Sequence, residues 1–171
     1  MNKIKILDGG MGTELINHGE KLPEHIWSAY INLTNPELVY KIHKNYIQSG
    51  SDYIITNTFR TTPRAFKKTG LTIKQAYDKS KKSFDLAIKS AKKASNKKIS
   101  ILGSISPLED CYLPEDFPGK DKAIKEFREI GEWFNEKKID CFLLETMNSI
   151  IETKLCLNEI RKFNIPIWVS F

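Results

Sequence analysis

Short apolar runs alternate with longer amphipathic segments along the whole chain, and this alternation limits the fold more than any other feature. Strands that alternate with helices form parallel sheets through right-handed crossovers. The apolar runs predict strands at residues 4–7, 52–56, 99–104, 141–144 and 165–171. Helical spacing predicts helices at 11–18, 34–50, 63–70, 72–94 and 120–137, and another that begins after Ser149. The sequence therefore predicts an α/β fold with a parallel sheet.

Capping signals support several of these helices. Asn35 and Pro36 are typical of a helix start, and Gly50 is typical of its end. Ser149 and Glu152 have the spacing of a capping box. In the longest helix, helical spacing predicts an inward face made of Ile73, Tyr77, Phe84, Ala87, Ile88 and Ala91.

The number of strands limits the architecture. A chain of 171 residues can bury a real core and suggests one domain. A closed (β/α)8 barrel takes ~250 residues, so five strands are too few for one. The chain also stops inside an apolar run, where a parallel strand would be buried and would need a further neighbour. On these grounds the fold is either an open sheet or the first five strands of a barrel.

Polar and glycine residues follow the predicted strands, and the carboxyl ends of parallel strands share one edge of a sheet. Two carboxylates at this edge could bind an ammonium group, and backbone N–H groups of glycines could bind a carboxylate. Together these groups could bind a free amino acid, which carries both an ammonium group and a carboxylate. The residues concerned are Asp8, Gly9 and Gly10 after the first strand, Asn57, Thr58 and Phe59 after the second, Gly103 to Pro107 after the third, and Glu145 after the fourth.

Structural alternatives exist for these residues. Asp8 could cap the helix that follows the glycines, and Glu145 could pair with a charge at the rim. His18, His25 and His43 show no metal-binding spacing, and His43 is expected at the surface or rim of its helix.

Basic residues are concentrated in one part of the chain, although its formal net charge is only +6. From Arg60 to Lys98, lysine and arginine greatly outnumber the two acidic residues, Asp78 and Asp85. Such a stripe could contact phosphates. However, its lysines lie opposite the apolar face and no aromatic stacking platform is interleaved, which favours a solvated helix face over a nucleic-acid site.

The three cysteines, Cys111, Cys141 and Cys156, form no CxxC pair and fit no zinc-ligand spacing. Their odd number favours a reducing compartment. The sequence has neither a signal-peptide core nor an apolar run of membrane-spanning length. A soluble cytoplasmic protein is therefore expected.

Several motifs together resemble the homocysteine S-methyltransferase family of zinc-dependent TIM-barrel enzymes. They occur in family order over nearly the whole chain. The motifs are Asp8–Glu14 (DGGMGTE), Asn35–Glu37 with His43 and Gly50, Thr56–Phe59 (TNTF), Gly103–Pro107 (GSISP), Glu145–Met147 preceded by Leu144 (LETM), and Pro166–Phe171 (PIWVSF).

The resemblance implies methyl transfer to the thiolate of homocysteine, which yields methionine. In the family, zinc held by three cysteines keeps the substrate sulfur deprotonated. The methyl donor is a sulfonium, a quaternary ammonium or an activated folate. By motif position, Asp8 and Glu145 would bind the amino group of homocysteine, Gly9 and Gly10 would lie against the amino acid, and Thr58 and Phe59 would line the pocket.

The sequence departs from the family in one important respect. The zinc-binding cysteines of the family follow its sixth strand and lie near its eighth, whereas this chain stops in the fifth. Residues 1–171 are therefore expected to form an incomplete homocysteine-binding (β/α) barrel domain that is inactive alone, with no catalytic residue and no metal ligand assigned. The expected partners are homocysteine and a methyl donor, without nucleic acid or membrane. The methyl donor and the oligomeric state stay open.

Two other functions remain as alternatives. One is a non-catalytic half-barrel that acts by binding another chain, and the other is a basic-helix nucleic-acid binder.

Overall fold

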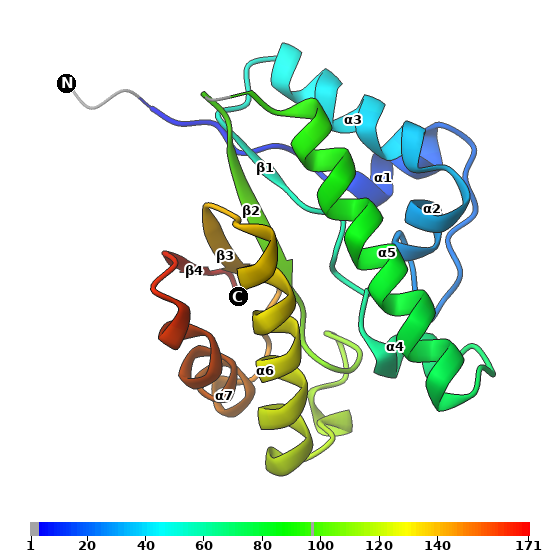
Figure 1. The fold of residues 1–171 in the computed structure, drawn as a ribbon, viewed down its shortest axis with the longest axis vertical. Coiled ribbons are helices and arrows are strands. Elements are labelled where there is room, and N and C mark those ends of the chain that lie inside the picture. Colours follow the sequence, from blue (N-terminus) through cyan, green and yellow to red (C-terminus); the bar gives the residue numbers. More distant parts are fainter. Residues whose placement is uncertain (1–3, 97) are drawn as a thin grey trace. The chain divides into compact units, whose positions relative to one another are not determined.

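The computed structural model describes residues 4–96 and 98–171 (Figure 1). Lys97, part of the basic segment, lies outside these residues. Helices and parallel strands alternate along the chain, which confirms the predicted α/β class. The elements are α1 (Met11–Asn17), α2 (Ala29–Thr34), α3 (Pro36–Gln48), β1 (Tyr53–Ile55), α4 (Pro63–Lys67), α5 (Ile73–Ala94), β2 (Ser100–Ile105), α6 (Lys120–Lys137), β3 (Cys141–Leu144), α7 (Ile150–Ile160) and β4 (Ile167–Val169), with 3-10 turns at Pro114–Asp116 and Arg161–Phe163.

The strands follow the order β1-β2-β3-β4, and the chain divides into two compact units, Met1–Leu102 and Gly103–Phe171. In the first unit, β1 pairs with the beginning of β2, from Tyr53 opposite Ser100 to Ile55 opposite Leu102. In the second unit, the amide of Glu145 donates to the carbonyl of Ile105 at the end of β2 (2.9 Å). β3 and β4 pair in parallel in that unit.

The segment before the glycines differs from its prediction. Only one bridge, between Leu7 and Tyr53, is formed in this part of the described chain, where a buried strand was expected. Ile4, Ile6 and Leu7 are 85%, 53% and 42% exposed. The segment lies along β1 because the amide of Tyr53 donates to the Ile6 carbonyl (3.1 Å), but this contact leaves its side chains uncovered.

In the first unit, α3 begins where its capping signal places it. The side chain of Asn35 accepts from the amide of Leu38 at the start of α3 (3.3 Å). Thr72 and Gln75 form a complete capping box at the start of α5, which sequence reasoning missed. α3 and α5 pack side by side (Figure 1). One apolar cluster of this unit contains Leu15, Ile31, Val39 and Ile42.

The inward face of α5 is only partly as predicted. Phe84 and the alanines near it are buried, but Ile73 is 73% exposed and Tyr77 41% exposed. The buried face continues instead through Ala76, Ser80 and Ser83. Small side chains on this face allow α5 to approach α2, α3 and α4 closely.

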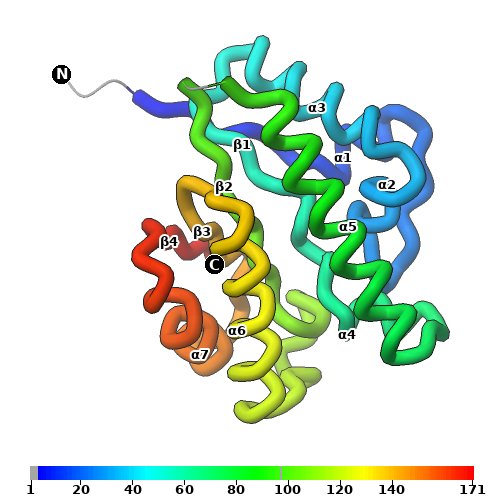
Figure 2. Tube along the Cα trace, viewed as in Figure 1, coloured from blue at the N-terminus to red at the C-terminus, as the bar shows by residue number. Residues whose placement is uncertain are grey.

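Aromatic side chains form the core of the second unit, where α6 and α7 pack side by side (Figure 2). The rings of Phe134 on α6 and Phe142 on β3 meet edge to face, with centroids 5.8 Å apart. Phe163 continues the cluster at 6.3 Å from Phe142. Phe127, Phe134 and Phe142 are fully buried. Edge-to-face pairs of this kind add to the stabilisation from apolar burial.

Gly103 on β2 is expected to tolerate no side chain. A Cβ at this position would lie 2.5 Å from Ile139 Cδ1 and 2.6 Å from Phe134 Cε1. Gly103→Ala should therefore lower the free energy of unfolding by about 1–3 kcal/mol through overpacking. Urea unfolding measures this loss. Adding Ile139→Val, which removes the nearest methyl group, should recover part of it, and an unchanged unfolding midpoint in Gly103→Ala would contradict the argument.

Candidate functional site

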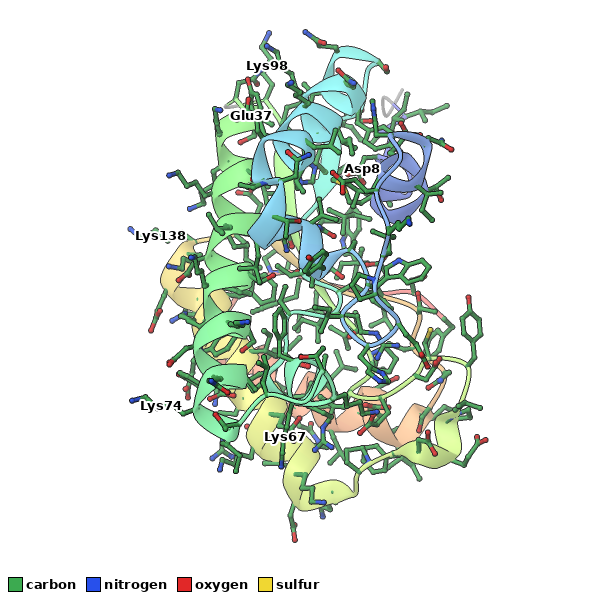
Figure 3. The ribbon with its side chains drawn as sticks, turned by 90° about the vertical axis from the view of Figure 1, so that its right-hand side faces the viewer. Asp8, Glu37, Lys67, Lys74, Lys98 and Lys138 are labelled. Carbon is green, nitrogen blue, oxygen red and sulfur yellow. The ribbon has the colours of Figure 1, made fainter. Side chains whose placement is uncertain are left out.

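Asp8 is held at the end of the first segment by backbone contacts. Its amide donates to the carbonyl of Tyr53 (3.0 Å), and its carboxylate oxygen Oδ2 accepts from the amide of Ile55 (2.9 Å). The N-cap of α1 is Gly10, which has no side chain to cap the helix. Asp8 therefore fixes the glycine segment to β1 and does not cap α1, although Figure 3 shows it close to that helix.

Two aromatic side chains pack against the glycine segment. A Cβ at Gly9 would lie 2.8 Å from the hydroxyl oxygen of Tyr46, and that hydroxyl donates to the carbonyl of Gly10 (3.4 Å). A Cβ at Gly12 would lie 2.8 Å from Nε1 of the Trp27 indole. Gly9 and Gly12 are thus required for the close approach of these rings, in addition to any role in ligand binding.

Sequence reasoning did not identify Tyr46 or Trp27 as neighbours of the glycines. Burial raises the pKa of Tyr46, and the nearby negative charges of Glu14 and Asp8 add to this effect. Trp27 has a φ of 42° and its side chain is 43% exposed. A bulky residue in this backbone region is unusual and occurs where the surrounding structure imposes it.

Thr58 and Phe59 lie in the loop after β1. The hydroxyl groups of Thr56 and Thr58 are hydrogen-bonded at 2.8 Å, and both residues are buried. The hydroxyl of Thr61 donates to the Thr58 carbonyl (2.9 Å). The guanidinium of Arg60 lies 5.5 Å from the centre of the half-buried Phe59 ring. The loop is therefore ordered by its own short contacts.

A buried amide network fixes the same loop to α2 and α5. The side-chain nitrogen of Asn57 donates to the carbonyl of Ser28 (3.0 Å) and to Oδ1 of Asn32 (2.8 Å). The side-chain nitrogen of Asn32 donates in turn to the Asn57 carbonyl (2.9 Å) and to Ser83 Oγ (3.1 Å). Ser83 completes the network by donating to the carbonyl of Ala29 (2.8 Å). The sequence contains Asn57 in a motif, but nothing in it identifies Asn32 as the partner.

Glu145 lies in the second unit, directly after β3. Ser104 Oγ on β2 donates to its carboxylate oxygen Oε2 at 2.6 Å, a short distance typical of a hydrogen bond to a charged acceptor. The side chain is half-buried. The next residue, Thr146, has a φ of 57°, so the chain turns sharply after the carboxylate. Ser104 therefore fixes the orientation of this carboxylate at the end of the strand.

The six predicted site residues are distributed over both units. Five of them, Asp8, Gly9, Gly10, Thr58 and Phe59, belong to the first unit, and Glu145 belongs to the second. That all six line one binding site stays a prediction.

His43 is placed differently from its prediction. It is 0% exposed on α3, where a surface or rim position was expected. Burial lowers its pKa from 6.5 to about 4, because the charged form would lose its hydration. Both ring nitrogens lack a hydrogen-bond partner among the described residues. His43 is therefore neutral at pH 7.

The described residues, 4–96 and 98–171, contain no metal-binding cluster. Nowhere among them do three or more His, Cys, Asp or Glu side chains lie close enough together to hold a metal ion. Cys141 and Cys156 are buried, and Cys111 is half-buried. Burial raises the pKa of both Cys141 and Cys156, which disfavours the thiolate form that binds metals.

Part of the basic segment takes part in the fold. Lys93 pairs with Glu37 (2.9 Å) and lies 4.0 Å from the centre of the Tyr40 ring. Lys81 pairs with Asp85 one turn further along α5 (3.9 Å). Figure 3 shows Lys74 pointing outward from the start of α5.

In the described part of the chain, no helix is both long enough and apolar enough to cross a membrane.

The sequence matches a known protein family along almost its whole length. The family described as homocysteine S-methyltransferase matches residues 5–171. Homocysteine S-methyltransferase 1 of Arabidopsis thaliana is 28% identical over 187 residues, which cover 97% of this chain and 57% of the relative. The selenocysteine Se-methyltransferase of Brassica oleracea var. italica is 35% identical over 82 residues, which cover 48% of this chain and 24% of that protein.

A solved structure has the same fold. The metallated form of the homocysteine methyltransferase MmuM from Escherichia coli superimposes with a TM-score of 0.80 and 26% identity, covering 99% of this chain and 64% of that chain. Its oxidised form gives a TM-score of 0.83 at 24% identity and is 62% covered. A partial (β/α) barrel fits these matches. The chain spans little more than half the length of the curated relatives that it matches along 97% of its residues.

Proposed function

Because this chain belongs to the homocysteine S-methyltransferase family, we propose that it provides the homocysteine-binding part of a methyltransferase. The reaction transfers a methyl group from a positively charged or activated donor to the sulfur of homocysteine and yields methionine. The observation that carries this proposal is the family match over residues 5–171, which includes every predicted site residue.

Each predicted residue has a chemical role in this proposal. The carboxylates of Asp8 and Glu145 bind the ammonium group of homocysteine, and the amides of Gly9 and Gly10 face its carboxylate. Thr58 and Phe59 line the part of the pocket that holds the side chain of homocysteine. The bonds from the Ile55 amide to Asp8 and from Ser104 to Glu145 support this assignment, since they hold both acceptors in fixed orientations. A preoriented carboxylate binds a cation with a smaller entropic cost.

The described residues do not fit the zinc site of the family. Their cysteines are dispersed, and they include no group of ligands that could hold a metal ion. The relative MmuM, by contrast, has a metallated form. We therefore derive no step through zinc for this chain. No zinc ligand is assigned within residues 1–171, and methyl transfer by the chain alone is not expected.

Replacing the carboxylate of Glu145 tests the proposed binding role. Glu145→Ala should weaken homocysteine binding by roughly ten- to hundredfold, because a charge-assisted hydrogen bond to the ammonium group is lost. Isothermal titration calorimetry on the 171-residue chain measures the dissociation constant. Glu132→Ala, at an exposed position on α6, is the control.

A ligand without the amino group sharpens this experiment. 4-Mercaptobutanoate keeps the thiol and the carboxylate of homocysteine but lacks its ammonium group. Its affinity should be low in the wild type and insensitive to Glu145→Ala. Equal losses for both ligands would show that the substitution disturbs the site generally, and an unchanged dissociation constant for homocysteine would exclude the assigned role.

A further inference from the structure

Glu152 is a buried carboxylate whose partner differs from the one predicted by the capping pattern. It lies in the first turn of α7 and is 3% exposed. Ser149 Oγ accepts from the Glu152 amide (3.4 Å), as expected of an N-cap. The Glu152 carboxylate, however, accepts from the amide of Leu108 (2.8 Å), which lies near the start of the long connection between β2 and α6. The side chain therefore links the first turn of α7 to the connection between β2 and α6.

A second side chain, in the loop just before α7, contacts the same connection. The side-chain nitrogen of Asn148 donates to the carbonyl of Cys111, three residues beyond Leu108. The segment 145–152 thus contacts the segment 108–111 at two backbone groups, an N–H and a C=O. Glu145, which is bonded to Ser104 at the end of β2, begins this segment.

The burial of Glu152 has a physical cost that its contact offsets. A carboxylate removed from water is unfavourable unless it accepts hydrogen bonds. The Leu108 amide provides one, and the N-terminal end of α7 provides a favourable dipole. Leu108 itself is 4% exposed, so its amide also needs a partner inside the protein. The pair satisfies both groups and fixes the position of the loop.

We infer that Glu152 is a positioning residue that holds residues 108–111 against the Glu145 loop, so that these two loops together form one wall of the homocysteine site. The consequence for binding rests on the proposed function. The contact itself does not, because it can be measured without any ligand. Glu152 acts through the backbone of Leu108 and has no direct role in the reaction.

Amide hydrogen exchange on the intact chain tests the contact. In Glu152→Ala, exchange at Leu108 should accelerate by roughly ten- to hundredfold, since a buried hydrogen bond to a charged acceptor is lost. The side chain of Glu152→Gln has the same length and keeps a carbonyl oxygen as acceptor, so the Leu108 amide should retain most of its protection from exchange. Glu159→Ala is the matched control, because Glu159 lies on the same helix but pairs with Arg128 (2.9 Å).

The exchange pattern decides the inference. Acceleration at Leu108 and its neighbours in Glu152→Ala, together with protection in Glu152→Gln and in the control, supports it. Unchanged exchange at Leu108 overturns it, and so does equal acceleration throughout α6 and α7, which indicates general destabilisation.

Homocysteine titrations of the same variants test the effect on the site. Weaker binding in Glu152→Ala, with recovery in Glu152→Gln, supports the positioning role, and unchanged binding overturns it. If the wild-type chain itself does not bind homocysteine, the proposed function fails, whereas the exchange result at Leu108 still decides whether Glu152 fixes the loop.

Discussion

Acidification from pH 6.5 to pH 4 is expected to lower the free energy of unfolding of the first unit by about 3 kcal/mol through His43 alone. The pKa of this residue falls from 6.5 to about 4 on folding. Between these pH values the unfolded chain binds a proton that the folded chain excludes. Protons therefore favour unfolding, and stability rises with pH until it levels off above 6.5.

Substitution of His43 separates its contribution from that of the carboxylates, which also titrate in acid. His43→Gln and His43→Leu both remove the titrating ring. The first replaces it with a polar side chain and the second with an apolar one. Urea unfolding at pH 4 and pH 6.5 should show a smaller loss of stability in both variants than in the wild type. His18→Gln, at an exposed position, should keep the wild-type loss. Equal losses in the wild type and both His43 variants would refute the prediction.

Several regular elements could be predicted well because local chemistry determines them, although the helix α2 was missed and the first predicted strand forms only one bridge. The predicted helix 120–137 and strand 141–144 have the observed bounds of α6 and β3. Asn35 and Pro36 begin α3 as their capping chemistry predicts. In each case the deciding interaction lies within a few residues along the chain. Family membership was also predictable, since the motifs occur in order over most of the sequence.

Burial was predicted less reliably, because it depends on what packs against a residue. The spacing of Ile73 places it on the apolar face of α5, but it lies at the first turn and is 73% exposed. His43 looked like a polar surface residue and is 0% exposed. Apolar Ile4 and Ile6 were expected inside a strand and are exposed. Periodicity shows which residues share a face, but it cannot show whether another element covers that face.

The candidate site shows the same division between local and distant effects. Glu145 directly follows β3, as the apolar run before it predicts, and Asp8 follows the apolar segment 4–7, which forms a single bridge to β1 in place of the predicted strand. Their partners, the Ile55 amide and Ser104, come from other parts of the chain and have no local signal. The close packing of Tyr46 on Gly9 was equally hidden, since the glycine itself suggested only a flexible turn or a ligand contact.

Asn57→Ala is expected to lower the free energy of unfolding by about 2–5 kcal/mol, because it breaks the buried amide network after β1. The substitution removes both donations of the Asn57 side chain, to the Ser28 carbonyl and to Asn32 Oδ1. Oδ1 of Asn32 loses its donor in the interior, which costs about 1–3 kcal/mol. The Ser28 carbonyl still accepts from the amide of Ile31 (3.1 Å), so its loss is one hydrogen bond of about 0.5–1.5 kcal/mol. Urea unfolding followed by circular dichroism measures the loss. Because Thr58 and Phe59 follow directly, their amides should also exchange faster.

The control and a double substitution show whether the network is responsible. Asn45→Ala removes the same side chain from an exposed position on α3 and should change stability by less than about 0.5 kcal/mol. Asn32 and Asn57 are partners, so the loss in Asn32→Ala/Asn57→Ala should be smaller than the sum of the single losses by about 0.5–3 kcal/mol. Additive losses would mean that the two amides act separately. In that case, the loop that carries Thr58 and Phe59 would be held by its threonine contacts, and the network would contribute only to general stability.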